Sequence, residues 1–236
     1  MDQKRSALLT QKSLAQAAYL LARRDEQLAS ILTSYGPPPL WRRPTGFTTL
    51  VRIILEQQVS LRSGESMFNR LAGSINPFVP ERFIQMGESH LRSLGVTRQK
   101  AAYLLHLSST LAGGDLRLDG LIRMNDADAK LALMRVKGIG SWSADVYLLM
   151  AMRRADAWPA GDLALAVAVR DLKGLEVKPG PEKLEELAES WRPYRAVAAR
   201  MLWQYYLRPK DNGRKVDSMQ PLVNGTRTTL KSLKPS

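Results

Sequence analysis

The amino-acid sequence predicts an all-α protein, and three observations point to this class. Apolar residues recur at spacings of three and four along most of the chain, which is typical of amphipathic helices. No sustained run alternates between apolar and polar residues, as a half-buried strand would. Glycine, proline and helix-capping residues separate the periodic segments. The 236 residues, 44% of them hydrophobic, suffice for one large domain or two small ones packed together.

The expected helices follow from this periodicity and from residues that start or stop helices. A first helix over 7–32 is stopped by the Gly-Pro-Pro-Pro run at 36–39, and Gly95 and Gly113-Gly114 are placed to end later helices. The side chains expected to cap later helices are Thr45, Ser60 or Ser63, Thr97 and Asn125. The later helices are expected over 45–55, 60–71, 81–86, 88–94, 97–111, 126–135, 142–153, 163–172, 181–190 and 193–207.

The composition limits the classes of partner and the compartment. A formal net charge of +13 and an isoelectric point near 10.2 favour a polyanionic partner, either nucleic acid or an anionic membrane surface. A basic protein without such a partner is the plainer alternative. The chain shows neither a transmembrane run nor a secretory signal, and its lack of cysteine excludes disulfides, cysteine-ligated zinc and a cysteine-held iron–sulfur cluster. We therefore expect an intracellular protein, in the cytoplasm or nucleoid if bacterial.

The segment V-K-G-I-G-S-W-S-A-D-V at 136–146 predicts a tight hairpin between two helices. Gly138 and Gly140 permit positive φ and leave no side chain between the backbone amides and a ligand. Because the following helix directs its positive end at the same place, the hairpin can bind a backbone phosphate without reading sequence. An ordinary helix–turn–helix corner is the alternative. The residues expected to contact DNA here are Lys137, Gly138, Gly140, Ser141 and Ser143.

A second segment, W-P-A-G-D-L-A-L at 158–165, places a single carboxylate at the start of the next helix. This residue, Asp162, can cap the helix, act in catalysis, or do both. A phosphate-binding hairpin with one acid nearby in the sequence suggests an enzyme that binds the DNA backbone and acts on a nucleotide.

Four further motifs accompany these two segments in a fixed order. They are PPPL at 37–40, LVRIILEQQVS at 50–60, GVTRQKAAYL at 95–104 and RPYRAVAA at 192–199. Over 28–208 the chain therefore resembles the helix-hairpin-helix (HhH-GPD) DNA glycosylase superfamily, and within it most closely the 3-methyladenine DNA glycosylase II group. The resemblance implies two helical lobes with an active cleft between them.

The same resemblance implies an organisation into four parts. An N-terminal helix and proline-rich connector at 1–44 would pack on the C-terminal lobe. A helical lobe at 45–150 would end in the hairpin, and a C-terminal lobe at 151–208 would carry the Asp162 loop. The polar, basic composition of 209–236 predicts a flexible tail.

By resemblance, the activity is that of a monofunctional DNA glycosylase, which flips an alkylated base of the 3-methyladenine type out of duplex DNA and hydrolyses its N-glycosidic bond. Asp162 would be the catalytic residue, because a carboxylate can stabilise the positive charge that develops on the sugar. Trp142 stands where bifunctional members carry a lysine nucleophile, so no lyase activity is expected. Its indole suits a cationic alkylated base, and core packing is its alternative role.

The resemblance also assigns an insertion residue and a cation site. Gln58 would fill the gap left by the flipped base, although some members carry an apolar residue there, and a helix-end hydrogen-bonding role for Gln57 and Gln58 stays open. Hairpins of this family often bind one Na⁺ or K⁺ through backbone carbonyls, here those of Met134, Val136 and Ile139. No other cofactor is expected. The expected partner is double-stranded DNA with damaged bases, bound by a monomer.

Plainer roles are favoured for three other candidates. Asp145 follows Trp142 by one helical turn and can face the pocket, but a solvent-facing or arginine-paired acid is the favoured interpretation. His90 and His106 lack partners at metal-ligand spacing, so a zinc site is not expected.

The aromatic residues of the last helix, Trp203, Tyr205 and Tyr206, are favoured as core residues. The alternative is that Trp203 or Tyr206 forms a wall of the pocket.

Two other functions stay open at this point. One is a non-catalytic helix-hairpin-helix DNA-binding module, and the other is a glycosylase for oxidised or mismatched bases.

Overall fold

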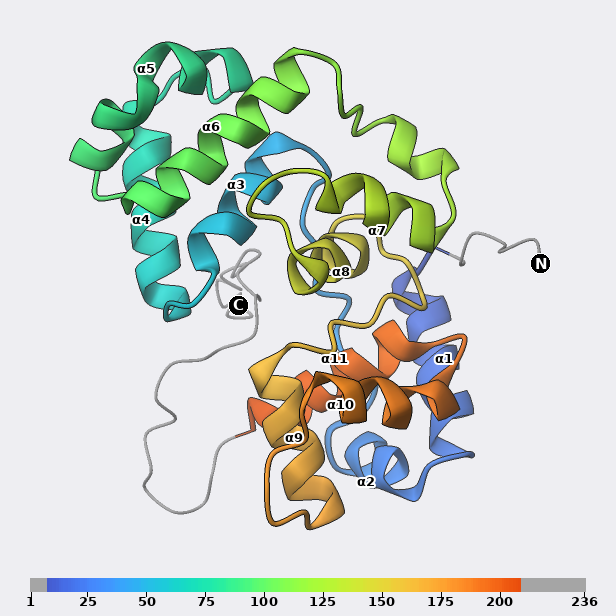
Figure 1. Cartoon of the computed structure of the whole chain (residues 1–236). Coiled ribbons are helices and arrows are strands. Elements are labelled where there is room, and N and C mark those ends of the chain that lie inside the picture. Colours follow the sequence, from blue (N-terminus) through green and yellow to red (C-terminus); the bar gives the residue numbers. More distant parts are fainter. Residues whose placement is uncertain (1–7, 209–236) are drawn as a thin grey trace, which may run out of the picture.

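In the computed structural model, which describes residues 8–208, the chain is helical as the sequence predicts (Figure 1). Within this range, extended pairing is limited to one isolated bridge between Leu8 and Arg154. None of the helices described is long and apolar enough to cross a membrane. The elements are α1 (Gln11–Ala22), α2 (Glu26–Tyr35), α3 (Phe47–Glu56), α4 (Leu61–Ser74), α5 (Pro80–Ser93), α6 (Arg98–Ala112), η1 (Gly120–Arg123), α7 (Asp126–Met134), α8 (Ser141–Met150), α9 (Leu163–Lys173), α10 (Pro181–Ala188), η2 (Glu189–Trp191) and α11 (Arg195–Tyr206).

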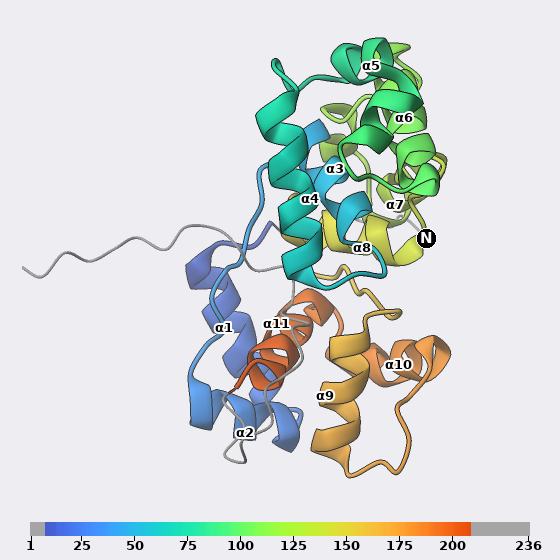
Figure 2. The ribbon, with the colours of Figure 1, turned by 90° about the vertical axis from the view of Figure 1, so that its left-hand side faces the viewer.

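The helices form two groups, which lie one above the other in two perpendicular views (Figures 1 and 2). We call α3 to α8 the hairpin lobe, and α1, α2, α9, α10 and α11 the terminal lobe. Two segments, 36–46 and 151–162, connect the lobes. The second connector ends at Asp162, so it delivers this residue to the place where the lobes meet.

The hairpin lobe is built around α3, which is buried along most of its length. The rings of Phe47, Phe78 and Phe83 pack together there, with centroids 5.0–6.0 Å apart. A buried ion pair between Arg43 and Glu56, 2.8 Å long, fastens the first connector to the end of α3. The helix that leads into the next turn is therefore held in place by this ion pair and by the packed phenylalanine rings.

In the terminal lobe the two ends of the described chain come together. Both views show α1 and α2 beside α11 (Figures 1 and 2). The indole N–H of Trp191 donates to the Asp25 carboxylate over 2.9 Å, and the Gln204 amide donates to the Tyr35 carbonyl over 3.0 Å. These bonds join segments that lie far apart in the sequence.

Most predicted helix starts are confirmed by their caps. The side chains of Ser60, Thr97 and Asn125 each accept a hydrogen bond from the backbone N–H three residues later. The two short helices expected over 81–86 and 88–94 form the single element α5, which is kinked at Gly87, where φ is 70°. The three caps were predictable because each depends on neighbouring residues alone.

The single helix expected over 7–32 is wrong. The first helix, α1, ends at Ala22, and Asp25 caps a new helix, α2, by accepting hydrogen bonds from the N–H groups of Gln27 and Leu28. The apolar periodicity continues across this break, which is why the pattern does not show it.

Two further boundaries differ from the prediction, and one expectation lies outside the structure. Gly46 rather than Thr45 is the N-cap of α3. The helix expected over 142–153 ends at Met150, and the chain then turns through Arg153, whose φ is 54°. The tail at 209–236 lies outside the described residues.

Two arginine anchors hold the connector that carries Asp162. The Arg154 side chain is fully buried and donates to the carbonyls of Leu121 (3.0 Å) and Met124 (2.9 Å). Further along, the Asp156 carboxylate accepts two hydrogen bonds, of 3.1 and 3.0 Å, from the guanidinium of Arg195. The connector is thus tied to both lobes before it reaches the site.

Candidate active site

Asp162 occupies the N-cap of α9, where three helices direct donors at its carboxylate. Oδ1 accepts from the backbone N–H of Leu165 over 3.0 Å and from the indole N–H of Trp203 over 3.1 Å. Oδ2 accepts from the indole N–H of Trp142 over 3.1 Å. Because Trp142 lies on α8 and Trp203 on α11, donors from both lobes fix this carboxylate in one orientation. The predicted capping role of Asp162 is confirmed.

The surroundings of Asp162 shift its pKa in opposite directions. Burial raises the pKa of Asp162, and the hydrogen bonds from Leu165, Trp203 and Trp142 lower it, with a net rise. The pKa of Tyr206 is raised by burial and, to a lesser degree, by the negative charge of Asp162. A carboxylate that is poorly solvated but well oriented is suited to stabilise a positive charge placed next to it.

Trp142 begins the second hairpin helix and contacts the connector. Its side chain is half-buried, and a Cβ atom added at Gly161 would lie 3.6 Å from the Trp142 Cβ. Because its polar atom bonds Asp162, Trp142 does more than fill the core. Whether its ring stacks on a base stays a prediction.

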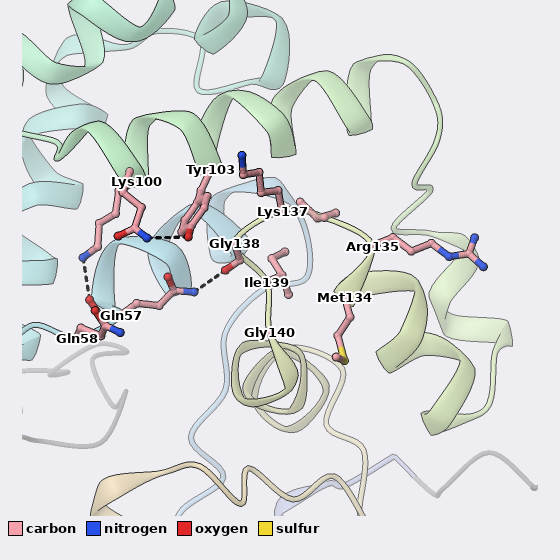
Figure 3. A pocket seen from close by; sticks show the side chains of 12 residues that line it. Gln57, Gln58, Lys100, Tyr103, Met134, Arg135, Lys137, Gly138, Ile139 and Gly140 are labelled. Carbon is pink, nitrogen blue, oxygen red and sulfur yellow. Dashed lines mark hydrogen bonds between the residues drawn. The ribbon is translucent and has the colours of Figure 1, made fainter.

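The predicted hairpin is present, and its two glycines have different surroundings (Figure 3). Gly138 adopts a φ of 92°, and a Cβ atom added there would lie 2.3 Å from the Cγ of Tyr103. Gly140 adopts a φ of −87°, and an added Cβ would meet no heavy atom within 4 Å. Gly138 is therefore needed to build the turn, whereas Gly140 leaves open space at the start of α8.

The other hairpin residues are divided between the surface and the interior. Lys137 and Ser141 are exposed, and the Lys137 backbone N–H donates to the Nδ1 atom of His106 over 3.2 Å. Ser143 is only 3% exposed, and its hydroxyl accepts a hydrogen bond from Gln57 over 2.9 Å. This position favours a structural role for Ser143 over the predicted contact with DNA.

Gln57 and Gln58 form the turn that follows α3 and behave differently. The Gln57 amide donates to the Gly138 carbonyl over 2.7 Å, so it joins the turn after α3 to the hairpin (Figure 3). Gln58 is exposed and adopts a φ of 55°, which is uncommon for a residue other than glycine. Gln57, at the end of α3, is thus a hydrogen-bonding residue whose side-chain partners lie in the hairpin and α8, and Gln58 stands at the tip of the turn.

These features occur within one matched region of the sequence. Residues 51–193, more than half of the chain, match the HhH-GPD superfamily of base excision DNA repair proteins. The chain belongs to this superfamily. The predicted family and the all-α fold class are both confirmed.

The HhH-GPD chain is similar to several glycosylases in sequence and fold. The putative DNA-3-methyladenine glycosylase YfjP of Bacillus subtilis is 25% identical over 75% of this chain, which spans only 64% of that protein's length. The 3-methyladenine DNA glycosylase of Schizosaccharomyces pombe, in complex with abasic DNA, has a similar structure with a TM-score of 0.73 at 24% identity, covering 80% of this chain and 95% of that one. A DNA-3-methyladenine glycosidase structure from Bacillus halodurans gives a TM-score of 0.70 at 26% identity, covering 80% and 88%.

Asp145 departs from the favoured prediction for this HhH-GPD chain. It is 4% exposed, and its carboxylate forms an ion pair with Lys130, a residue of α7, over 2.7 Å. It is therefore neither solvent-facing nor arginine-paired. Asp145 lies on α8, and the packing of α7 against α8 buries it and brings Lys130 to it. Burial raises the pKa of Asp145 to about 6, while the Lys130 charge acts against that rise.

Three of the remaining aromatic and histidine candidates, Trp203, Tyr205 and His106, have structural partners. Trp203 is buried, as favoured, but it also holds Asp162, and Tyr205 stacks under the Arg208 guanidinium at 3.4 Å. His106 accepts a hydrogen bond from the hairpin backbone, and His90 is exposed. Over the described range, no group of three His, Asp or Glu residues could hold a metal ion.

The predicted cation site consists of backbone atoms, so the test is whether its carbonyls are available. The Val136 carbonyl accepts a hydrogen bond from the Ile139 N–H over 3.0 Å, which leaves one lone pair for a cation. Carbonyl oxygens of this kind suit a hard monovalent ion, so the Val136 carbonyl is compatible with the site, and the cation itself stays a prediction.

The structure also shows one site residue that the sequence analysis did not single out. Lys100 is 8% exposed and donates to the carbonyls of Leu55 (2.6 Å) and Gln57 (2.9 Å), at the end of α3. A lysine in an otherwise apolar helix face is a weak signal, and its partners lie too far away in the sequence to be found from spacing.

Proposed function

We propose that this HhH-GPD protein is a monofunctional DNA glycosylase that removes an alkylated base of the 3-methyladenine type from duplex DNA. The observation that carries the proposal is the Asp162 carboxylate, held by donors from both lobes beside the hairpin helix α8. An acid used only as a helix cap would not need two indole donors, one buried and one half-buried. The names of the similar proteins support the same activity.

The proposed reaction uses the charge of Asp162. As the bond between base and sugar lengthens, positive charge develops on the sugar, and the fixed carboxylate stabilises it electrostatically. The same oxygens can orient the attacking water. The base leaves with the electron pair of the broken bond, the water oxygen bonds to the sugar carbon and passes a proton to the Asp162 carboxylate, and the DNA strand keeps an abasic site.

The preference for an alkylated base rests on the aromatic and apolar groups near Asp162. Alkylation at a ring nitrogen makes a purine cationic, and an indole attracts a cation by about 0.5–2 kcal/mol. Trp142 is half-buried, Tyr206 lies within the electrostatic reach of Asp162, and Leu163 is 41% exposed. These groups favour a cationic base over a neutral oxidised or mismatched one, and the retained Asp162 argues against a non-catalytic module.

DNA binding is proposed to use the hairpin and the basic surface. The amides at Gly138 and Gly140, with the Lys137 and Ser141 side chains, would hold a backbone phosphate, and one Na⁺ or K⁺ on the carbonyls of residues 134, 136 and 139 would neutralise part of its charge. The protein would act as a monomer on one damaged nucleotide at a time, flipped from the duplex at a cost of a few kcal/mol.

The absence of a lysine at position 142 predicts that no covalent intermediate forms. With an abasic duplex and borohydride, a lysine Schiff base would be reduced to a stable protein–DNA adduct. We expect no adduct from this chain under conditions in which a bifunctional glycosylase is trapped completely. Trapping of the native chain, seen as a band of reduced mobility on a denaturing gel, would refute the role assigned to Trp142.

The replacement Trp203→Phe is predicted to shift the pH dependence of base release. It removes one N–H donor to the ionised carboxylate, a loss of about 1.5–3 kcal/mol, and keeps an aromatic ring in the core. Since the hydrogen bond lowers the pKa of Asp162, its loss raises that pKa, and the acidic limb of the rate profile moves to higher pH. The measurement is the single-turnover rate of base release as a function of pH, from mildly acidic to mildly alkaline buffer.

Trp191→Phe is the matched control for this prediction. Trp191 is also buried and also donates to a carboxylate, that of Asp25, but it lies away from Asp162. Both variants should melt at lower temperature, and only the Trp203 variant should shift the profile. Coincident profiles for the Trp203 variant and the native chain would contradict the proposed role of the indole.

A further inference from the structure

We propose that Lys100 and Gln57 are positioning residues that join the turn carrying Gln58 to the phosphate-binding hairpin. Binding of the DNA backbone at the hairpin and insertion of Gln58 into the duplex then occur as one event. The inference rests on the proposed function and gives Lys100 and Gln57 a part in insertion, beyond the hydrogen bonds described above. Neither residue needs to touch DNA, since each acts through the turn that carries Gln58.

Lys100 holds the turn from the side of the protein core. The last carbonyls of a helix have no partner within the helix, and a cation at that end is favourable. Lys100 reaches from α6 to two such carbonyls, those of Leu55 and Gln57, at 2.6 and 2.9 Å. Burial lowers the pKa of Lys100, and the negative charge of Glu56 acts against this lowering.

Gln57 holds the turn from the side of the hairpin. Its Nε2 atom carries two hydrogens, and it donates to the Gly138 carbonyl over 2.7 Å and to the Ser143 hydroxyl over 2.9 Å. Both donor positions are therefore used, one on the hairpin loop and one on α8. The backbone of Gln57 is bound to Lys100 while its side chain is bound to the hairpin.

Gln58 follows directly and adopts an unfavourable backbone conformation. Its φ of 55° persists only where the surrounding structure fixes the chain, and the residue before it is fixed on two sides. The result is an exposed side chain at the tip of a rigid turn. A rigid tip inserts into a base stack at a lower entropic cost than a mobile loop does.

The turn and the hairpin border the same groove. An open cavity of about 410 Å³ is lined by residues of the turn, of α6 and of the hairpin, as Figure 3 shows. The lining includes Lys100 and Gln57 together with Lys137, Gly138 and Gly140 of the hairpin. A DNA strand bound at the hairpin would therefore pass beside the turn.

The test measures insertion on DNA that cannot be cleaved. The probe is a duplex with a tetrahydrofuran abasic analogue opposite 2-aminopurine, whose fluorescence reports the residue entering the gap. With saturating protein, we expect Gln57→Leu and Lys100→Met to slow the fluorescence change by about tenfold, the effect of one or two lost hydrogen bonds, with little change in affinity. Gln99→Leu, a matched change on the same groove that bonds only Tyr103, should behave as the native chain.

Two further variants separate positioning from general destabilisation. Lys100→Arg keeps a cation and its donors and should restore insertion. If Gln57 acts through Gln58, the double variant Gln57→Leu/Gln58→Ala should be no slower than Gln58→Ala alone. Native insertion rates in the Gln57 and Lys100 variants, or additive effects in the double variant, would overturn the inference. Insertion without any base release from methylated DNA would instead overturn only the proposed function.

Discussion

Replacing Asp162 by asparagine is expected to lower the rate of base release by about a thousandfold or more, because the variant lacks the negative charge that is placed to stabilise the sugar cation. Asparagine can still cap α9 and accept from Leu165. With the amide oxygen kept at the Oδ1 position, which also accepts from Trp203, the amide NH2 takes the place of Oδ2 and puts an N–H donor against the Trp142 indole. The measurement is the single-turnover release of base from methylated duplex DNA at saturating protein.

The control for this prediction lies on the same helix. Asp171→Asn makes the same change of charge on α9, where Asp171 pairs with Arg170 away from the indoles. It should leave the rate within about twofold of the native value, as most surface changes do. Duplex affinity should be similar in all three proteins, since no phosphate contact is assigned to Asp162. Substantial base release by the Asp162 variant, with normal folding, would remove the carboxylate from the reaction.

Gly138→Ala is expected to destabilise the protein and to weaken its binding to duplex DNA. A positive φ costs an alanine about 1–2 kcal/mol, and its Cβ would lie 2.3 Å from a ring carbon of Tyr103, so the turn or the ring must move. Together with about 1–3 kcal/mol for overpacking, the loss should lower the melting temperature by roughly 4–20 °C. The same displacement misplaces the amides that are proposed to bind phosphate.

Gly140→Ala separates the two effects. Its backbone conformation suits alanine, and the added Cβ meets no protein atom within 4 Å, so the melting temperature should not change. If a phosphate approaches the backbone at Gly140, the methyl group will still weaken DNA binding. Melting curves and duplex titrations at fixed salt measure both quantities. Full affinity in the Gly140 variant would contradict phosphate binding at the start of α8.

Much of the fold could be predicted because its signals are local. Capping by Ser60, Thr97 and Asn125 depends on residues within one turn, and the sequence pattern identifies it directly. The break at Asp25 was missed, although Asp25 also caps its helix through neighbouring residues, the N–H groups of Gln27 and Leu28. The periodicity continues through it, and the Asp25 carboxylate also bonds Trp191, a residue near the other end of the described chain.

The site shows the same division between local and distant signals. The glycine turn and the cap at Asp162 were predictable from the motifs themselves. The partners of Asp162 were not, because the Trp203 indole reaches it only after α11 packs beside α9. The ion pair between Asp145 and Lys130 likewise depends on how two helices pack, which spacing along one helix does not reveal.

The most direct test of the account is the product formed from methylated duplex DNA. The native chain should release free alkylated base, identified by mass spectrometry, and strand breaks should appear only after alkali treatment, which marks an intact abasic site. Asp162→Asn should release almost none. Tight binding of the methylated duplex by the native chain, with no free base at any protein concentration, would show that the carboxylate between the two indoles does not perform this reaction.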